Sequence, residues 1–169
     1  GCDVAIEEGV TIGHNNIIKG KTRIKKGARI GNGNVIEDCV VDEGAVIESS
    51  HAVRSYIGKG TSVGPYANLR ADNVIGEKCK IGDFVELKSC TIGDGSKLSH
   101  LTYAGNAVIG KGCNVGAGVV FANYDGKDKH TTVVGDNAFI GSSSTIIAPV
   151  KIEDGAFIAA GSVINAFVP

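Results

Sequence analysis

The chain has 169 residues, with 17 Lys plus Arg against 18 Asp plus Glu and a formal net charge of −1. This balance gives no support for nucleic-acid binding, which generally needs a basic face. No run of about 18 apolar residues predicts a membrane span, and no basic and apolar leader is visible. The 25 glycines, the absence of Trp and Met and the 5% aromatic content instead indicate an internal repeat, because such a core must pack small side chains.

Aliphatic residues recur every six positions, with two one-residue slips and one longer gap. In chain order they are Ile6, Ile12, Ile18, Ile24, Ile30, Ile36, Val41, Ile47, Val53, Ile57, Val63, Leu69, Ile75, Ile81, Leu87, Ile92, Leu98, Tyr103, Ile109, Val115, Phe121, Val134, Ile140, Ile146, Ile152, Ile158 and Ile164. The residue two before each is usually small, and the residue after it is often Gly, which favours a tight bend. A helical spacing of 3.6 residues would leave this register within two repeats.

The period of six predicts an all-β fold, a parallel β-helix of hexapeptide repeats. With three hexads per triangular coil, the 27 hexads predict about nine coils. At roughly 4.8 Å per stacked strand the prism would be about 40 Å long. We therefore expect a single β-helix domain over residues 1–169.

Cysteines in this repeat are expected to be buried thiols rather than reactive groups. The four that occupy the small inward slot are Cys39, Cys79, Cys90 and Cys113. Cys commonly behaves as a small buried hydrophobe, and no C-x-x-C supports a redox pair or a zinc ribbon. Free thiols in a chain without a leader fit a reducing cytoplasm.

Histidines give little support for a metal site. His14 and His51 are expected on exposed corners, and the four histidines lie 30 to 49 residues apart in the sequence. A zinc site needs convergent ligands, often with two of them close in sequence. No metal is therefore predicted.

His100 is the sharpest candidate for chemistry. Coil arithmetic places Leu98, Val115, Ile140 and Ile158 on one side of the prism, and the residues two beyond them in one column: His100, Ala117, Ser142 and Ala160. Small residues next to His100 would leave a groove beside an imidazole that can accept a proton at neutral pH. A purely structural role for this His is the alternative.

A pair of cations is predicted on the next side. Arg70 and Lys88 follow Leu69 and Leu87, which places them one coil apart with no acid between them. Such a pair would be stabilised by an anion such as a phosphate. Alternatively, both side chains extend into water.

The gap of 13 residues between Phe121 and Val134 predicts a loop over residues 122–133. It carries several polar and charged side chains: Asn123, Tyr124, Asp125, Lys127, Asp128, Lys129 and His130. Loops that project from a regular scaffold often bind ligands, although a plain surface insertion is equally compatible with the sequence.

Five segments together resemble one family, the C-terminal acetyltransferase domain of bifunctional N-acetylglucosamine-1-phosphate uridyltransferases / glucosamine-1-phosphate acetyltransferases. They are residues 99–103 (SHLTY), 114–118 (NVGAG), 123–126 (NYDG), 148–150 (APV) and 158–161 (IAAG). The likeness is specific from about Ile57 to Ile164, so residues 57–169 are expected to carry the acetyltransferase site, whereas residues 1–56 match only the generic repeat. The resemblance implies a left-handed β-helix and a homotrimer with sites between subunits.

The resemblance also implies a reaction: acetyl transfer from acetyl-CoA to the amine of glucosamine-1-phosphate, on the route to UDP-N-acetylglucosamine for the cell wall. It implies His100 as the general base. It places Arg70, Lys88 and Lys129 around the sugar phosphate, with Tyr103, Asn114 and Asn123 on the sugar. It places Tyr124, Ser142 and Ala160 along acetyl-CoA.

Two parts of the family pattern are missing from the sequence. The nucleotidyltransferase domain is absent, so no uridyltransferase activity is expected, and the chain ends before the family's basic C-terminal tail, which puts cofactor affinity in question. The alternatives are a non-catalytic trimeric module and a hexapeptide acyltransferase with another amino-sugar acceptor; a metalloenzyme is a more distant one.

Overall fold

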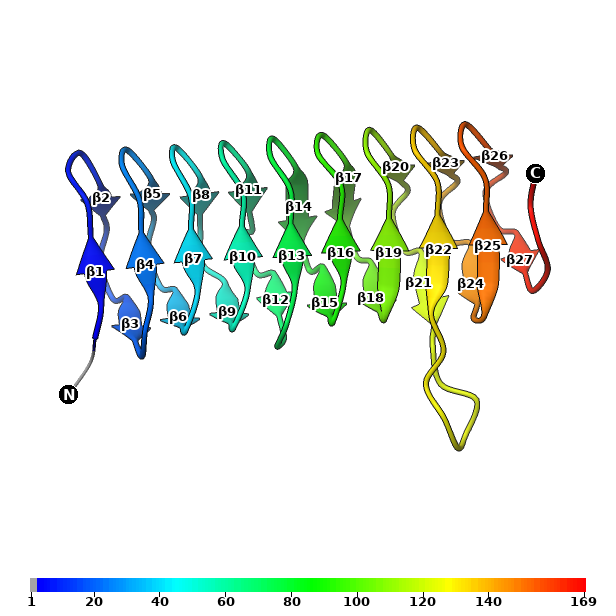
Figure 1. The fold of residues 1–169 in the computed structure, drawn as a ribbon, viewed down its shortest axis with the longest axis horizontal. Helices are drawn as coiled ribbons and strands as arrows, with labels where there is room; N and C mark the ends of the chain where they lie inside the picture. The colour runs from blue at the N-terminus through cyan, green and yellow to red at the C-terminus, as the bar shows by residue number, and fades with distance from the viewer. Residues whose placement is uncertain (1–2) are drawn as a thin grey trace.

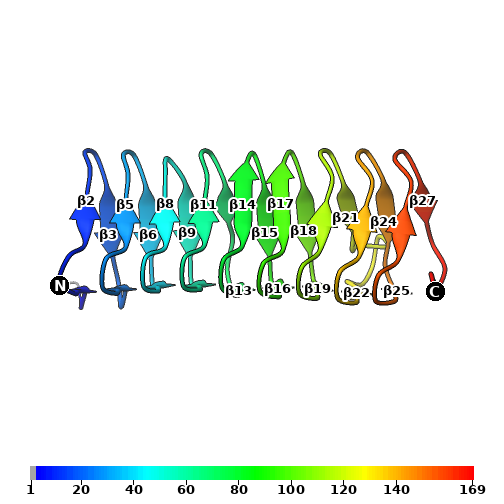
Figure 2. The same cartoon turned by 90° about the horizontal axis from the view of Figure 1, so that it is seen from above.

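The computed structural model describes residues 3–169 as a three-sided prism in which the chain winds through nine coils. The coils follow one another along the long axis in chain order, so that the first strand, β1, and the last, β27, lie at opposite ends of the prism (Figures 1 and 2). The fold is a left-handed parallel β-helix, as expected. None of the described residues forms a helix, so none provides a helix long and apolar enough to cross a membrane.

Each side of the prism is one nine-stranded parallel sheet. Sheet A contains β1 (Ala5–Ile6), β4 (Arg23–Ile24), β7 (Val40–Val41), β10 (Tyr56–Ile57), β13 (Val74–Ile75), β16 (Thr91–Ile92), β19 (Ala107–Ile109), β22 (Thr132–Val134) and β25 (Val150–Ile152). Sheet B contains β2 (Thr11–Ile12), β5 (Arg29–Ile30), β8 (Val46–Ile47), β11 (Ser62–Val63), β14 (Lys80–Asp83), β17 (Lys97–His100), β20 (Asn114–Val115), β23 (Phe139–Ile140) and β26 (Phe157–Ile158). Sheet C contains β3 (Ile17–Lys19), β6 (Val35–Glu37), β9 (His51–Val53), β12 (Asn68–Leu69), β15 (Glu86–Lys88), β18 (Tyr103–Gly105), β21 (Val120–Ala122), β24 (Thr145–Ile147) and β27 (Val163–Ile164).

The core is a stack of the predicted aliphatic residues, flanked by the small inward slots. Leu98, Val115, Ile140 and Ile158 align in neighbouring strands of sheet B, as expected. The cysteines in the inward slots are buried and free: Cys39, Cys79, Cys90 and Cys113. Burial raises the pKa of the Cys39 thiol to about 11, so this thiol stays protonated at neutral pH.

Two positions of the predicted register are wrong. The inward residue of β9 is Ala52, aligned with Ile36 and Leu69, and not Val53. The inward residue of β18 is Ala104, between Leu87 and Phe121, and not Tyr103. In both strands the inward residue is an alanine with a larger neighbour, and a pattern based on large apolar residues selects that neighbour instead. In β18 the small Ala104 leaves volume beside Phe121, a fully buried ring.

Two smaller expectations also need correction. The loop occupies residues 123–131, because Ala122 and Val133 belong to β21 and β22. It projects from the junction of sheets C and A, well outside the outline of the coils (Figure 1). His14 is exposed at a bend as predicted, whereas His51 is exposed within β9 and not at a corner, since the register of that coil is shifted by one residue.

Candidate functional site

His100 is the last residue of β17, at the edge where sheet B ends and the chain turns into sheet C. Its Nδ1 atom hydrogen-bonds to Oδ1 of Asp83, the last residue of β14, which the strand register places directly beside it. This hydrogen bond, together with the attraction of His100, lowers the pKa of Asp83. A carboxylate can only accept, so the bond puts the ring proton on Nδ1 and leaves the lone pair on Nε2.

Asp83 was missed in the sequence, although it lies 17 positions before His100, the length of one shortened coil. The strand register and the backbone bonds of neighbouring coils confirm the column predicted next to His100. Gly118 donates to the carbonyl of His100 over 3.2 Å, Ser143 to that of Ala117 over 2.7 Å, and Gly161 to that of Ser142 over 2.8 Å. Ser142 and Ala160 are exposed. We call Asp83, His100, Ala117, Ser142 and Ala160 the His corner.

The column also determines how far its members lie from His100. Ser142 lies two coils beyond His100, about 10 Å at the usual spacing of strands, so it does not contact the imidazole. The backbone N–H of Ala117 is one coil away and finds no acceptor among the described residues. It is therefore available to a ligand or to water.

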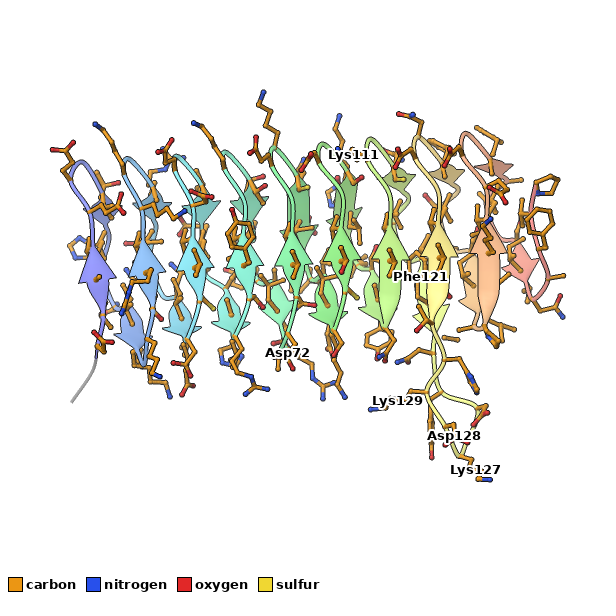
Figure 3. All side chains as sticks on the ribbon, in the orientation of Figure 1. Asp72, Lys111, Phe121, Lys127, Asp128 and Lys129 are labelled. Carbon is orange, nitrogen blue, oxygen red and sulfur yellow. The ribbon has the colours of Figure 1, made fainter. Side chains whose placement is uncertain are left out.

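A second cluster lies at the opposite edge of sheet C. Arg70 directly follows β12, Lys88 ends β15 and Lys129 lies in the loop after β21. The pKa of Lys88 is lowered by contact with and repulsion from Lys129, and further by the charge of Arg70. Figure 3 shows Lys129 projecting from the side of the loop that faces the earlier coils, whereas Lys127 and Asp128 lie at its tip. We call Arg70, Lys88 and Lys129 the cation corner.

The prediction that no acid lies between Arg70 and Lys88 is wrong. Glu86 accepts a hydrogen bond from Nη1 of Arg70 over 3.0 Å. Its signal in the sequence was its place two residues before Lys88, which puts both side chains on the outer face of β15. Glu86 leaves Lys88 without a carboxylate partner among the described residues, so the excess positive charge is concentrated on Lys88 and Lys129.

The loop that supplies Lys129 is a short hairpin held by Asp125. Its Oδ1 accepts the backbone N–H groups of Lys127 and Asp128 over 2.8 and 2.7 Å, and its Oδ2 lies 2.6 Å from Nε2 of His130. His130 and the two amides lower the pKa of Asp125. Tyr124 and Lys129 face each other in an antiparallel bridge. These contacts fix the position of Lys129 against the prism.

Of the remaining predicted residues, Tyr103 and Asn123 lie on the coils that follow Lys88 along sheet C: Tyr103 is aligned with Glu86, and Asn123 directly follows β21. Asn123 is nearly buried at the base of the loop, where it donates to Oδ1 of Asn106 over 2.7 Å and lies 3.4 Å from the hydroxyl of Tyr103. Tyr124 is exposed on the loop. Asn114 begins β20 on the outer face of sheet B, aligned with Lys97 and Phe139, and joins neither corner.

The two corners stay apart within one copy of the chain. They lie at opposite edges of sheet C, separated by one side of a coil, which is about five residues or roughly 15–20 Å long. The structure also has a groove of about 600 Å³ on sheet A over Val40, Tyr56 and Val74, which holds none of the predicted site residues. Within the described residues, no three His, Cys, Asp or Glu side chains converge as metal ligands would.

Two family models match parts of the chain. The model of the GMPPB C-terminal domain matches residues 51–137, just over half of the chain. The chain belongs to the GMPPB C-terminal domain family. The model of six bacterial transferase hexapeptide repeats matches residues 131–166.

The chain is also similar over nearly its whole length to curated bacterial proteins. The bifunctional protein GlmU of Clostridium novyi (strain NT) is 50% identical over 165 residues, which cover 98% of the chain and 36% of the relative. The GlmU of Clostridium acetobutylicum is 48% identical over 169 residues, 100% of the chain and 37% of the relative. The predicted resemblance to the C-terminal region of a bifunctional enzyme is confirmed, and the chain spans a little over a third of the length of these relatives.

Solved structures agree on the fold alone. A UDP-N-acetylglucosamine O-acyltransferase (LpxA) from Moraxella catarrhalis RH4 superimposes with a TM-score of 0.65 at 14% identity, over 92% of this chain and 65% of that one. LpxA from Bacteroides fragilis 9343 gives a TM-score of 0.61 at 21% identity, over 98% and 67%.

Proposed function

We propose that this region transfers the acetyl group of acetyl-CoA to the amine of glucosamine-1-phosphate. The observation that carries the proposal is the cation corner, where Lys88 lies near Arg70 and Lys129 with no carboxylate partner of its own among the described residues, and the like charges lower its pKa. Mutual repulsion of this kind is relieved by a dianion such as a sugar phosphate. The GlmU relatives and the matching motifs support the same acceptor.

In the proposed mechanism the cations hold the phosphate and thereby position the amine. The lone pair on Nε2 of His100 takes a proton from the amine as its nitrogen attacks the thioester carbonyl. Negative charge then builds up on the carbonyl oxygen, for which the free N–H of Ala117 and the hydroxyl of Ser142 are the candidate donors. The C–S bond then breaks as the thiolate of CoA leaves, and His100 gives its proton to this thiolate, which restores the neutral imidazole.

Acetyl-CoA acts here as the acetyl-donating substrate. The column beyond His100 consists of the small residues Ala117, Ser142 and Ala160, two of them exposed. A thin acyl arm fits along such a column without meeting large side chains. Asn114 and Tyr124 stay candidate contacts to the sugar and to acetyl-CoA.

We also propose a homotrimer that forms its sites between copies. One copy places the His corner and the cation corner at opposite edges of sheet C, too far apart for a single sugar phosphate. Next to the His corner lies an exposed apolar row: Tyr66, Phe84 and Leu101 are 61%, 58% and 60% exposed. All three have positive φ values, of 60°, 54° and 52°, which side chains of this size adopt at a cost. A neighbouring copy that buries this row would compensate the cost.

Free buried thiols support a location in the cytoplasm.

The test is thioester consumption with glucosamine-1-phosphate as acceptor. We expect His100→Ala to lower the rate by about 10²–10⁴-fold, the usual contribution of a general base, whereas His14→Ala, which removes another exposed histidine, leaves it unchanged. Equal turnover of glucosamine and glucosamine-1-phosphate would refute the assigned role of the cation corner. Full activity of His100→Ala would refute the base.

A further inference from the structure

The pairing of Asp83 with His100 is built into the backbone. β14 and β17 each have four residues, whereas every other strand described has two or three. The extra residues carry the ladder past the inward Ile81 and Leu98 as far as Asp83 and His100, which are aligned partners. The sheet is thus lengthened at the one place where it holds these two side chains together.

Gly82 permits this close approach. A Cβ atom on Gly82 would lie 1.9 Å from the carbonyl oxygen of Ser99, in the opposite strand. Its backbone φ is not in the left-handed region, so what requires a glycine here is the close approach of the next coil at the bend and not backbone strain. Any larger residue would push β14 away from β17 and separate Asp83 from His100.

The chemistry of the pair favours one form of the imidazole. His100 is 53% exposed at its side chain, so without a partner its ring would rotate and exchange tautomers in water. Asp83 is held ionised by its bond to His100, and the charge of Lys80 on the same strand acts in the same direction. The remaining charged residue on these two strands is Lys97, which is aligned with Lys80. An ionised carboxylate on Nδ1 fixes both the ring plane and the tautomer.

We infer that Asp83 is a positioning residue that holds His100 in the Nδ1–H tautomer with Nε2 free to accept the proton of the acceptor amine. The inference rests on the proposed function, because it assigns the base to Nε2 of His100. It adds a residue that neither the sequence motifs nor the resemblance includes. If Asp83 only linked two coils, its removal would leave the tautomer and kcat of the folded protein unchanged.

The experiment combines kinetics with ¹⁵N NMR of the His100 ring. We expect Asp83→Ala to lower kcat by about 10–100-fold, as loss of a residue that orients a histidine commonly does, with KM for the acceptor nearly unchanged. In the same variant the ring nitrogens should report a mixture of tautomers instead of one. Asp83→Asn, whose amide oxygen still accepts from Nδ1, should give intermediate values of both. Glu43→Ala, which removes an exposed ion pair with Lys59 elsewhere on the prism, is the matched control.

The outcomes separate the two proposals. An unchanged kcat and an unchanged tautomer in folded Asp83→Ala would overturn the positioning role while His100→Ala stays inactive. Failure of the unmodified protein to acetylate glucosamine-1-phosphate would overturn the proposed function, and the NMR result would still show whether Asp83 sets the tautomer. Circular dichroism of each variant, with Asp83→Asn as the variant closest in shape, shows that a loss is not one of folding.

Discussion

Among single residues, Lys88 reports most directly on the predicted phosphate site. The pKa of Lys88 lies below its ordinary value of 10.5 because Lys129 and Arg70 are close and carry the same charge. Removing one of these charges weakens the repulsion that disfavours the ammonium form. We therefore expect Lys129→Ala to raise the pKa of Lys88 toward 10.5, and also to raise KM for a phosphorylated acceptor.

The measurement is an NMR titration of the Lys88 ammonium in each variant. Lys127→Ala is the control, since Lys127 lies at the tip of the same loop (Figure 3). A pKa of Lys88 that stays the same in Lys129→Ala would show that the loop does not hold Lys129 against the prism, and the cation corner would lose a member.

The element that brings Lys129 to the prism is the loop hairpin, and its order depends on the charge of Asp125. The pKa of Asp125 is below its ordinary value of 3.8 because His130 and two backbone amides bind the carboxylate. A lowered pKa means that the stabilisation is present above pH 3.8 and is lost as the pH falls below it. We expect the amide protons of Lys127 and Asp128 to exchange faster in this acid range, and at neutral pH in Asp125→Ala.

Amide hydrogen exchange by NMR checks this prediction. Asp128→Ala is the control, because Asp128 contributes its backbone rather than its side chain to the hairpin. Slow exchange of both amides in Asp125→Ala would mean that the hairpin is held by its backbone alone.

The elements were more predictable than the contacts between their side chains. A strict period of six repeats one backbone unit, so counting located the coils and the column of His100 and Ser142. It misassigned Val53 and Tyr103, since the residue that packs inward there is an alanine and the pattern is recognised by large side chains. Asp83 and Glu86 were missed for another reason: each acts through a partner a coil away, and a single sequence does not show which outward side chains of neighbouring coils meet.

In the whole molecule, stacking explains why the chemistry is spread over a surface. Each coil contacts only its neighbours, and between the end coils the inward positions of the described residues are filled by buried side chains. The interior of this part of the prism is therefore occupied by the core, and functional groups lie on its faces and edges. Sheet C separates the His corner from the cation corner by its own width, which makes a second copy the simplest way to bring them together.

Mixing two inactive variants tests this arrangement. If each site combines the His corner of one copy with the cation corner of the next, co-expressed His100→Ala and Lys88→Ala chains form some sites from two intact corners. Random assembly at equal amounts pairs an intact His100 with an intact Lys88 at about one interface in four in a closed ring. We therefore expect activity to recover to about a quarter of that of the unmodified protein. Lys88→Ala mixed with Arg70→Ala should show no recovery, because every site then contains a damaged cation corner. An intact mixed oligomer of the first pair, verified by native mass spectrometry, that stays as inactive as its parents would place both corners of each site in one chain.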